Sequence, residues 1–87
     1  MNTIEATRNA REAIEALLGK PADTVSSCRK HENGWTVTLE VVETKARIAD
    51  NDMIASYRVE IDSTGEIANY AREQRYQRSN AAHVAAA

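Results

Sequence analysis

The chain has 87 residues and a formal net charge of −2, with 43% hydrophobic and 28% charged residues. This length fits one small domain with a modest core and leaves little room for a deeply buried catalytic cleft. The near-neutral charge argues against bulk attraction to nucleic acid or to an anionic membrane surface. Composition therefore points to a small domain that works by contact rather than by chemistry.

Residues 3–18 are predicted to form an amphipathic helix, because apolar side chains recur there at spacings of three and four. The predicted apolar stripe consists of Ile4, Ala10, Ala13, Ile14, Leu17 and Leu18. Asn2 is a suitable N-cap, and Glu5 follows three residues later, as in a capping box. Gly19 and Pro21 then supply a stop signal.

From Ala22 onward the apolar period changes to two, which predicts strands. Asn33-Gly34 predicts a two-residue type I′ hairpin turn that joins a strand over 24–32 to a strand beginning at Trp35. One face of this second strand carries Trp35, Val37, Leu39 and Val41, and the other carries Thr36, Thr38 and Glu40. Residues 44–53 are predicted to form a loop, with the acidic cluster 50–52 in solvent.

Alternation resumes with Tyr57, Val59 and Ile61 on the core side of a third strand. Asp62 to Gly65 predict a type I turn closed by a glycine bulge, followed by a fourth strand over 66–78. A three-residue loop of 63–65 would fix the register of this hairpin. In this register Asp62 faces Glu66. The predicted pairs on the core side are then Ile61 with Ile67 and Tyr57 with Ala71, and those on the other side are Arg58 with Tyr70 and Ser56 with Arg72.

The predicted fold class is therefore α+β, with one N-terminal helix packed on a four-stranded antiparallel meander. This layout resembles the PepSY-type fold. We expect a single domain over 1–78, followed by an Ala-rich tail over 79–87 to which no function is assigned. The lone Cys28 cannot close an intramolecular disulfide, and the sequence shows neither a signal peptide nor a membrane-spanning run, so the cytoplasm is the expected compartment.

Side chains that carry chemistry are sparse. His31 and His83 are the only histidines, and no CxxC, HxxxH or HExxH pattern accompanies them, so no metal site is predicted. The residues 26–28 lie near His31 in sequence, but nothing marks a nucleophilic pocket around them. Three glycines, each already used to end a helix or shape a turn, leave none for a phosphate-binding loop. We therefore expect no catalytic activity and no cofactor.

The segment 69–78 is locally basic and rich in tyrosine. Tyr70, Arg72, Tyr76 and Arg78 share a parity and would line the sheet face away from the helix, beside Arg58. We predict a partner-binding patch of Arg58, Tyr70, Arg72 and Tyr76, because arginine and aromatic residues dominate protein-contact hot spots. Two other interpretations stay open: stacking with single-stranded nucleic acid, and a structural role in which Arg58 covers Tyr70 as a cation–π pair.

Several fragments, taken in order and spacing, resemble the gas vesicle protein O (GvpO) family. They are the tryptophan strand ending in Glu-Val-Val-Glu (35–43), Arg47-Ile48, the strand Ala-Ser-Tyr-Arg-Val-Glu-Ile-Asp (55–62), and Arg-Tyr-Gln-Arg (75–78). The resemblance covers residues 35–78. Ala49 stands where the family usually has proline, and the long polar N-terminal extension of many members is not seen.

This resemblance implies a non-enzymatic accessory protein for gas vesicle assembly, found in the cytoplasm and associated with gas vesicles. Its expected partners are other gas vesicle accessory proteins, with the shell protein as a further candidate, and no catalytic residue is carried over. Alternative hypotheses are a nucleic-acid-binding regulator of gas vesicle gene expression, and a PepSY-like inhibitor of a secreted enzyme, which the missing export signal disfavours. An exposed edge strand would also allow homodimerisation by strand addition.

Overall fold

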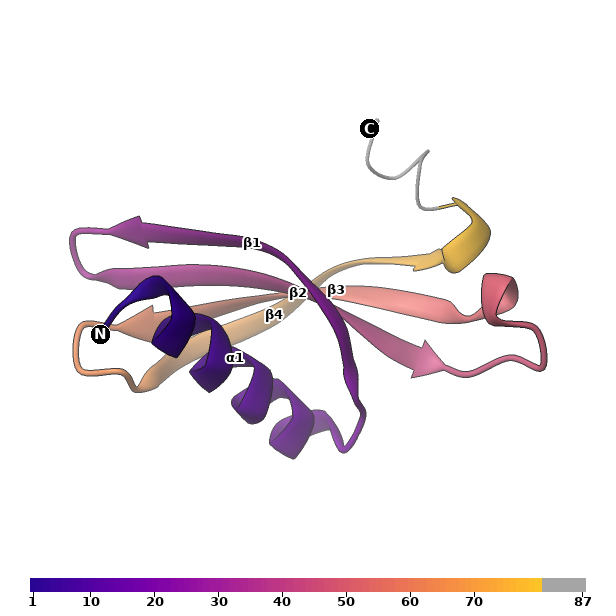
Figure 1. Ribbon diagram of the computed structural model, residues 1–87, viewed down its shortest axis with the longest axis horizontal. Coiled ribbons are helices and arrows are strands. Elements are labelled where there is room, and N and C mark those ends of the chain that lie inside the picture. Colours follow the sequence, from indigo (N-terminus) through magenta and orange to yellow (C-terminus); the bar gives the residue numbers. More distant parts are fainter. Residues whose placement is uncertain (81–87) are drawn as a thin grey trace.

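A computed structural model describes residues 1–80 as one helix beside a four-stranded antiparallel sheet (Figure 1). The elements are α1 (Thr3–Leu18), β1 (Ala22–His31), β2 (Gly34–Thr44), η1 (Ala49–Asn51), β3 (Met53–Asp62), β4 (Ile67–Gln77) and η2 (Arg78–Asn80), where η marks a short 3-10 helix. The strand order β1-β2-β3-β4 confirms the predicted α+β meander. Of the predicted tail, residues 81–87 lie outside the part described.

Helix α1 begins and ends at the predicted residues. The Asn2 side chain accepts a hydrogen bond from the Glu5 backbone at 2.9 Å, and Glu5 Oε1 accepts one from the Asn2 backbone at 3.2 Å, which forms the predicted capping box. Gly19 takes the left-handed cap conformation at φ 67°.

The buried side of α1 is narrower than predicted. Its buried residues are Ala6, Ala10 and Ile14, spaced four apart, whereas Ile4 and Leu17 are 69% and 53% exposed. The prediction that Ile4 and Leu17 belong to the core is therefore wrong. Small alanine side chains at the contact let the helix axis approach the sheet closely, so large side chains on either flank of the stripe stay outside it.

The main core lies between α1 and one face of the sheet, referred to below as the helix face. Its sheet side consists of the predicted alternating residues Trp35, Val37, Leu39 and Val41 of β2 and Val59 and Ile61 of β3. Tyr57 and Cys28 pack against its edge. Figure 1 shows α1 beside the half of the twisted sheet that ends in the two hairpin turns. The opposite face is referred to as the open face.

The turn between β1 and β2 differs from the prediction. Glu32 and Asn33 form the turn, and His31 pairs with Gly34. A type I′ turn needs a positive φ at both central residues, but within residues 1–80 only glycines have one. The prediction of a type I′ turn at Asn33-Gly34 is therefore wrong. Gly34 is the first residue of β2 and adopts φ 147°. A Cβ there would lie 1.9 Å from the Ile61 carbonyl oxygen, so this glycine serves the close approach of β2 to β3.

The turn between β3 and β4 has the predicted three-residue loop. The backbone of Asp62 pairs with that of Glu66 at 2.9 Å, and the Asp62 side chain accepts hydrogen bonds from the Thr64 hydroxyl and from the backbones of Thr64 and Glu66. These bonds, chiefly that from the Thr64 hydroxyl, lower the pKa of Asp62.

Beyond this turn the predicted register is wrong. Ile61 faces Ile67 as predicted, but the register then shifts twice, once at Ala68 and once at Glu73. The observed pairs are Arg58 with Ala71, Tyr57 with Arg72, and Ser56 with Gln74, in place of Arg58 with Tyr70, Tyr57 with Ala71, and Ser56 with Arg72. Each extra residue on β4 is a β-bulge, which turns every following side chain to the other face of the sheet.

Gly34→Ala should destabilise the fold more than Gly19→Ala does. Both glycines have positive φ, but a Cβ at Gly19 has no neighbour within 4 Å, whereas a Cβ at Gly34 would clash with the β3 backbone. We expect a loss of about 1 kcal/mol for Gly19→Ala and of more than about 3 kcal/mol for Gly34→Ala, measured by urea unfolding. Equal losses would mean that β2 and β3 do not approach as closely as described.

Candidate functional site

The four predicted partner-binding residues do not share a face. Tyr70 lies opposite Val59 and Arg72 opposite Tyr57, which places both on the helix face. Arg58 and Tyr76 lie on the open face, because the bulge at Glu73 restores the parity that the bulge at Ala68 had reversed. The premise of one continuous patch is therefore wrong.

Tyr76 is held within the sheet by a carboxylate. Its hydroxyl donates to Glu40 Oε1 at 2.7 Å, Ser56 donates to the same oxygen at 2.6 Å, and Ser26 donates to Glu40 Oε2 at 3.0 Å. Glu40 lies on β2, and its three partners lie on β1, β3 and β4. One side chain, only 9% exposed, thus connects all four strands on the open face. We refer to it and its three hydroxyl donors as the Glu40 network.

The Glu40 network changes the acidity of the tyrosine. Burial, followed by the hydrogen bond to Glu40 and the negative charge of that carboxylate, raises the pKa of Tyr76 from 10.0 to about 12. Deprotonation would replace a donated hydrogen bond by repulsion between two anions. Tyr76 is therefore a structural donor across the physiological pH range.

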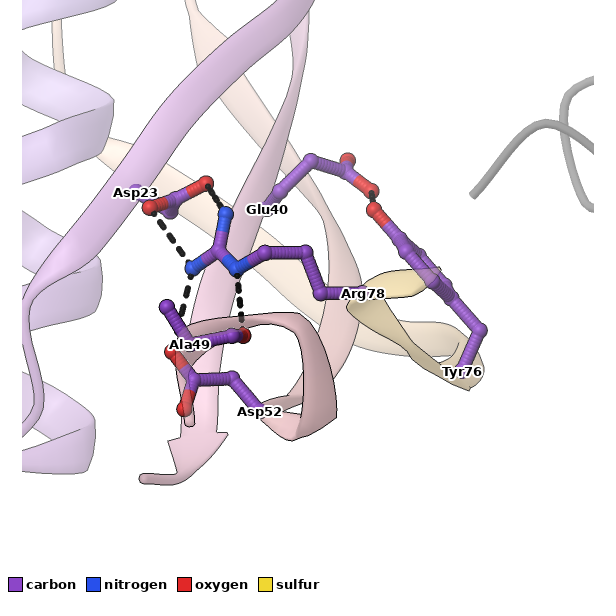
Figure 2. A network of polar contacts seen from close by, with 6 residues as sticks. All are labelled: Asp23, Glu40, Ala49, Asp52, Tyr76 and Arg78. Atoms are coloured by element: carbon purple, nitrogen blue, oxygen red, sulfur yellow. Dashed lines mark hydrogen bonds and ion pairs between the residues drawn. The ribbon is translucent and has the colours of Figure 1, made fainter. Parts of the chain in front are cut away.

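A second polar cluster closes the same end of the sheet. Figure 2 shows the Arg78 guanidinium between β1 and the loop that precedes β3. It pairs with both oxygens of Asp23 at 3.1 and 3.2 Å, donates to the Ala49 carbonyl at 3.1 Å, and lies 3.3 Å from Asp52 Oδ2. The hydrogen bonds to Asp23 are the main cause of the raised pKa of Arg78.

Asp52 belongs to this cluster, and the prediction that residues 50–52 are a solvated acidic loop is wrong for it. Asp52 is 3% exposed, its Oδ1 accepts from the Ala46 backbone at 2.7 Å, and its carbonyl accepts from the Arg78 backbone at 2.8 Å. Ile54, on the open face beside Tyr76, is 1% exposed. The open face is therefore covered at this end by the chain's own side chains and does not form a free surface there.

The other end of the open face carries paired charges. The Thr36 hydroxyl donates to Glu60 at 2.8 Å, and His31 lies 3.8 Å from the same carboxylate. Arg58 pairs with Glu60 and Glu73, each at 3.3 Å. His31 is exposed beside the turn, as predicted. Within residues 1–80 no group of three His, Cys, Asp or Glu residues is arranged so that it could hold a metal ion.

The helix face carries an uncovered groove between α1 and β4, with a volume of about 590 Å³. Leu17 and Tyr70, which are 53% and 42% exposed, line it together with the small residues Ala13, Ala16 and Ala68. We refer to it as the α1–β4 groove. It is apolar and open to solvent.

A basic cluster lies further along the same face. Arg72 and Arg75 both pair with Glu43, at 3.1 and 2.6 Å, and Lys20 donates to the Glu43 carbonyl at 2.5 Å. Two arginines thus share the Glu43 carboxylate, and a lysine binds the backbone carbonyl of the same residue. Arg72 follows Tyr70 by two residues on the helix face, so the cluster continues the line of the groove.

The sequence model of a protein family, gas vesicle synthesis protein GvpO, matches residues 1–82 of this chain. The chain belongs to the GvpO family. This confirms the family resemblance on far more of the chain than the fragments over 35–78. No solved structure matches, and the likeness to the PepSY-type fold stays a prediction.

Three curated relatives are named as gas vesicle protein O or O1. Gas vesicle protein O of a Streptomyces species is 43% identical over 82% of this chain and 56% of its own length. Gas vesicle protein O1 of Halobacterium salinarum is 32% identical over 86% of this chain and 63% of its own, and gas vesicle protein O of Haloferax mediterranei is 30% identical over 87% and 55%. The chain therefore spans between about half and two thirds of the length of these relatives. None of the helices in residues 1–80 is both long enough and apolar enough to cross a membrane.

Sequence reasoning on this GvpO chain missed the carboxylates that close the open face, Asp23, Glu40 and Asp52. One signal was present in the neighbouring residues. Val41-Val42 and Ile54-Ala55 place apolar side chains on both faces of adjacent strands, which indicates that both faces are covered at that point. A carboxylate beside such a pair is then expected to be buried and hydrogen-bonded.

Tyr76→Phe should lower the free energy of unfolding by about 1–2 kcal/mol at pH 8, because Glu40 loses a donor. A tyrosine whose pKa is raised on folding contributes stability below its unfolded pKa and loses it as pH rises. The difference in free energy of unfolding between the native chain and Tyr76→Phe should therefore shrink between pH 10.0 and about 12. Urea unfolding across this range tests it, with the groove variant Tyr70→Phe as the control; a gap that does not change with pH would contradict the network.

Arg78→Lys should loosen the segment before β3, because an ammonium group cannot make the paired contacts with Asp23 and also reach the Ala49 carbonyl. We expect the backbone amides of Ala46 and Asp52 to exchange with solvent roughly tenfold faster. Hydrogen–deuterium exchange read by NMR measures this. The exposed Arg47→Lys is the matched control, and unchanged protection in Arg78→Lys would show that Arg78 does not hold this segment.

Proposed function

We propose that this GvpO-family chain is a non-enzymatic accessory protein in gas vesicle assembly and that it acts through protein–protein contact at the α1–β4 groove. The observation that carries the proposal is that Leu17 and Tyr70, both exposed, line one apolar groove. Exposed apolar surface rimmed by polar residues is typical of interaction sites. Its partners are other gas vesicle proteins, and its place of action is the cytoplasm beside the forming vesicle.

The contact residues follow from the observed faces. Tyr70 and Arg72 lie on the helix face next to the groove and are proposed to contact the partner. Tyr76 is occupied by Glu40, and Arg58 lies on the open face between two glutamates, so neither can join the same contact. The predicted patch is thereby reduced to its helix-face half.

The geometry favours protein contact over nucleic-acid binding. Arg72 and Arg75 share Glu43, and Arg78 pairs with Asp23 and Asp52, which reduces the positive charge available to a phosphate backbone. The two tyrosines of β4 also lie on opposite faces, so they do not form a shared stacking surface for bases.

The double variant Leu17→Ala with Tyr70→Ala should reduce gas vesicle yield about tenfold in a vesicle-forming host whose own copy of the gene is deleted. Yield is measured as the turbidity lost when pressure collapses the vesicles. Ile4→Ala with Ile48→Ala is the matched control, because these apolar residues are even more exposed but do not line the groove. Full yield from a groove variant that folds, as judged by circular dichroism, would refute the proposed function.

A further inference from the structure

A single helix leaves part of the helix face uncovered. Helix α1 packs against β1, β2 and β3. An α-helix is about 10 Å across, whereas the outer strands of a four-stranded sheet are about 14 Å apart, and side chains extend this width further. A strip of the helix face over β4 is therefore left beside α1, and the α1–β4 groove lies along it.

The shape of this strip suits another helix. One wall is α1 itself, through Ala13, Ala16 and Leu17, and the floor is β4, through Ile67 and Ala68. Small residues on both elements permit close approach of a second helix axis. A partner strand would instead pair with the outer edge of β4 and would not lie in the layer that α1 occupies.

The basic side chains at one end of the strip favour an acidic binding partner. Arg72 and Arg75 share the single carboxylate of Glu43, Lys20 donates to the Glu43 backbone carbonyl, and the two arginine side chains remain 52% and 49% exposed. The nearest helix carboxylate in sequence, Glu15, is turned toward β1, where it accepts from the Ala22 backbone at 3.0 Å. The cluster thus retains excess positive charge toward solvent.

We propose that the α1–β4 groove binds an amphipathic helix of a partner protein, which places apolar side chains against Leu17 and Tyr70 and acidic side chains against Arg72 and Arg75. The inference rests on the proposed function, and it adds the secondary structure and the charge of the partner segment. Charge complementarity of this kind chiefly sets specificity and the rate of encounter.

Three synthetic peptides of about 18 residues, long enough for five helical turns, test the inference. The first has leucines at helical spacing and glutamates elsewhere, the second has lysines in place of the glutamates, and the third has the composition of the first with leucines at alternate positions, as in a strand. Each is labelled, and its binding to the purified full chain is measured by fluorescence anisotropy at low and high salt.

We expect the acidic helical peptide to bind at least about tenfold more tightly than the other two, with an affinity that falls as salt rises. Leu17→Ala with Tyr70→Ala, and Arg72→Glu with Arg75→Glu, should each weaken it by about tenfold. Arg58→Glu is the matched control, because it reverses an arginine paired with glutamates on the opposite face.

Equal binding of the lysine peptide would overturn the charge assignment, and equal binding of the alternating peptide would indicate strand addition at β4 instead of a helix. Concentration-dependent dimerisation that is lost in Leu17→Glu would identify a second copy as the occupant and would also overturn the inference. The peptide measurements are independent of the gas vesicle yield of the groove variants. The proposed function is therefore tested separately, by that yield.

Discussion

The Glu40 carboxylate is the constraint on which the two faces of this sheet depend. Removing a carboxylate from water is costly unless hydrogen bonds replace its hydration, and here three hydroxyls from three other strands do so. Ser26 reaches Glu40 from the neighbouring strand β1, and the long Tyr76 side chain reaches it from β4 across β3. At the same end, Arg78 connects β1 to the loop before β3 through its hydrogen bonds to Asp23 and to the Ala49 carbonyl. These contacts occupy one end of the open face, and the contact surface proposed above lies on the helix face.

Local signals in the sequence were sufficient for the individual elements. The capping box at Asn2 and Glu5, the stop at Gly19 and the turn at 62–65 each involve residues within five positions of one another. Alternation also identified the core side of β2, because Trp35 to Val41 follow an unbroken period of two. These features together predicted the helix, the meander and their order.

The faces of β4 could not be predicted in the same way. Ala68 and Glu73 are ordinary strand residues in sequence, yet each is the extra residue of a bulge, and no glycine or proline marks either position. Bulges arise from the twist of the sheet and from what its side chains must reach, and these are tertiary properties. The single face predicted for the patch is wrong for this reason: Tyr70 and Arg72 were assigned to the face that Tyr76 occupies.

The bulges also explain how one strand can serve both faces. Before the Glu73 bulge, Tyr70 lines the groove and Arg72 follows it on the same face; after the bulge, Tyr76 enters the Glu40 network. A regular strand would place all three side chains on one face.

The nuclear Overhauser spectrum of the full chain tests this arrangement most directly, because it reads the face of each tyrosine in solution. The account predicts cross-peaks from the Tyr76 ring to Ser56 and from the Tyr70 ring to Leu17. Cross-peaks from the Tyr70 ring to the Arg58 side chain would instead restore the regular register, and the division of the sheet into a closed face and a binding face would be wrong.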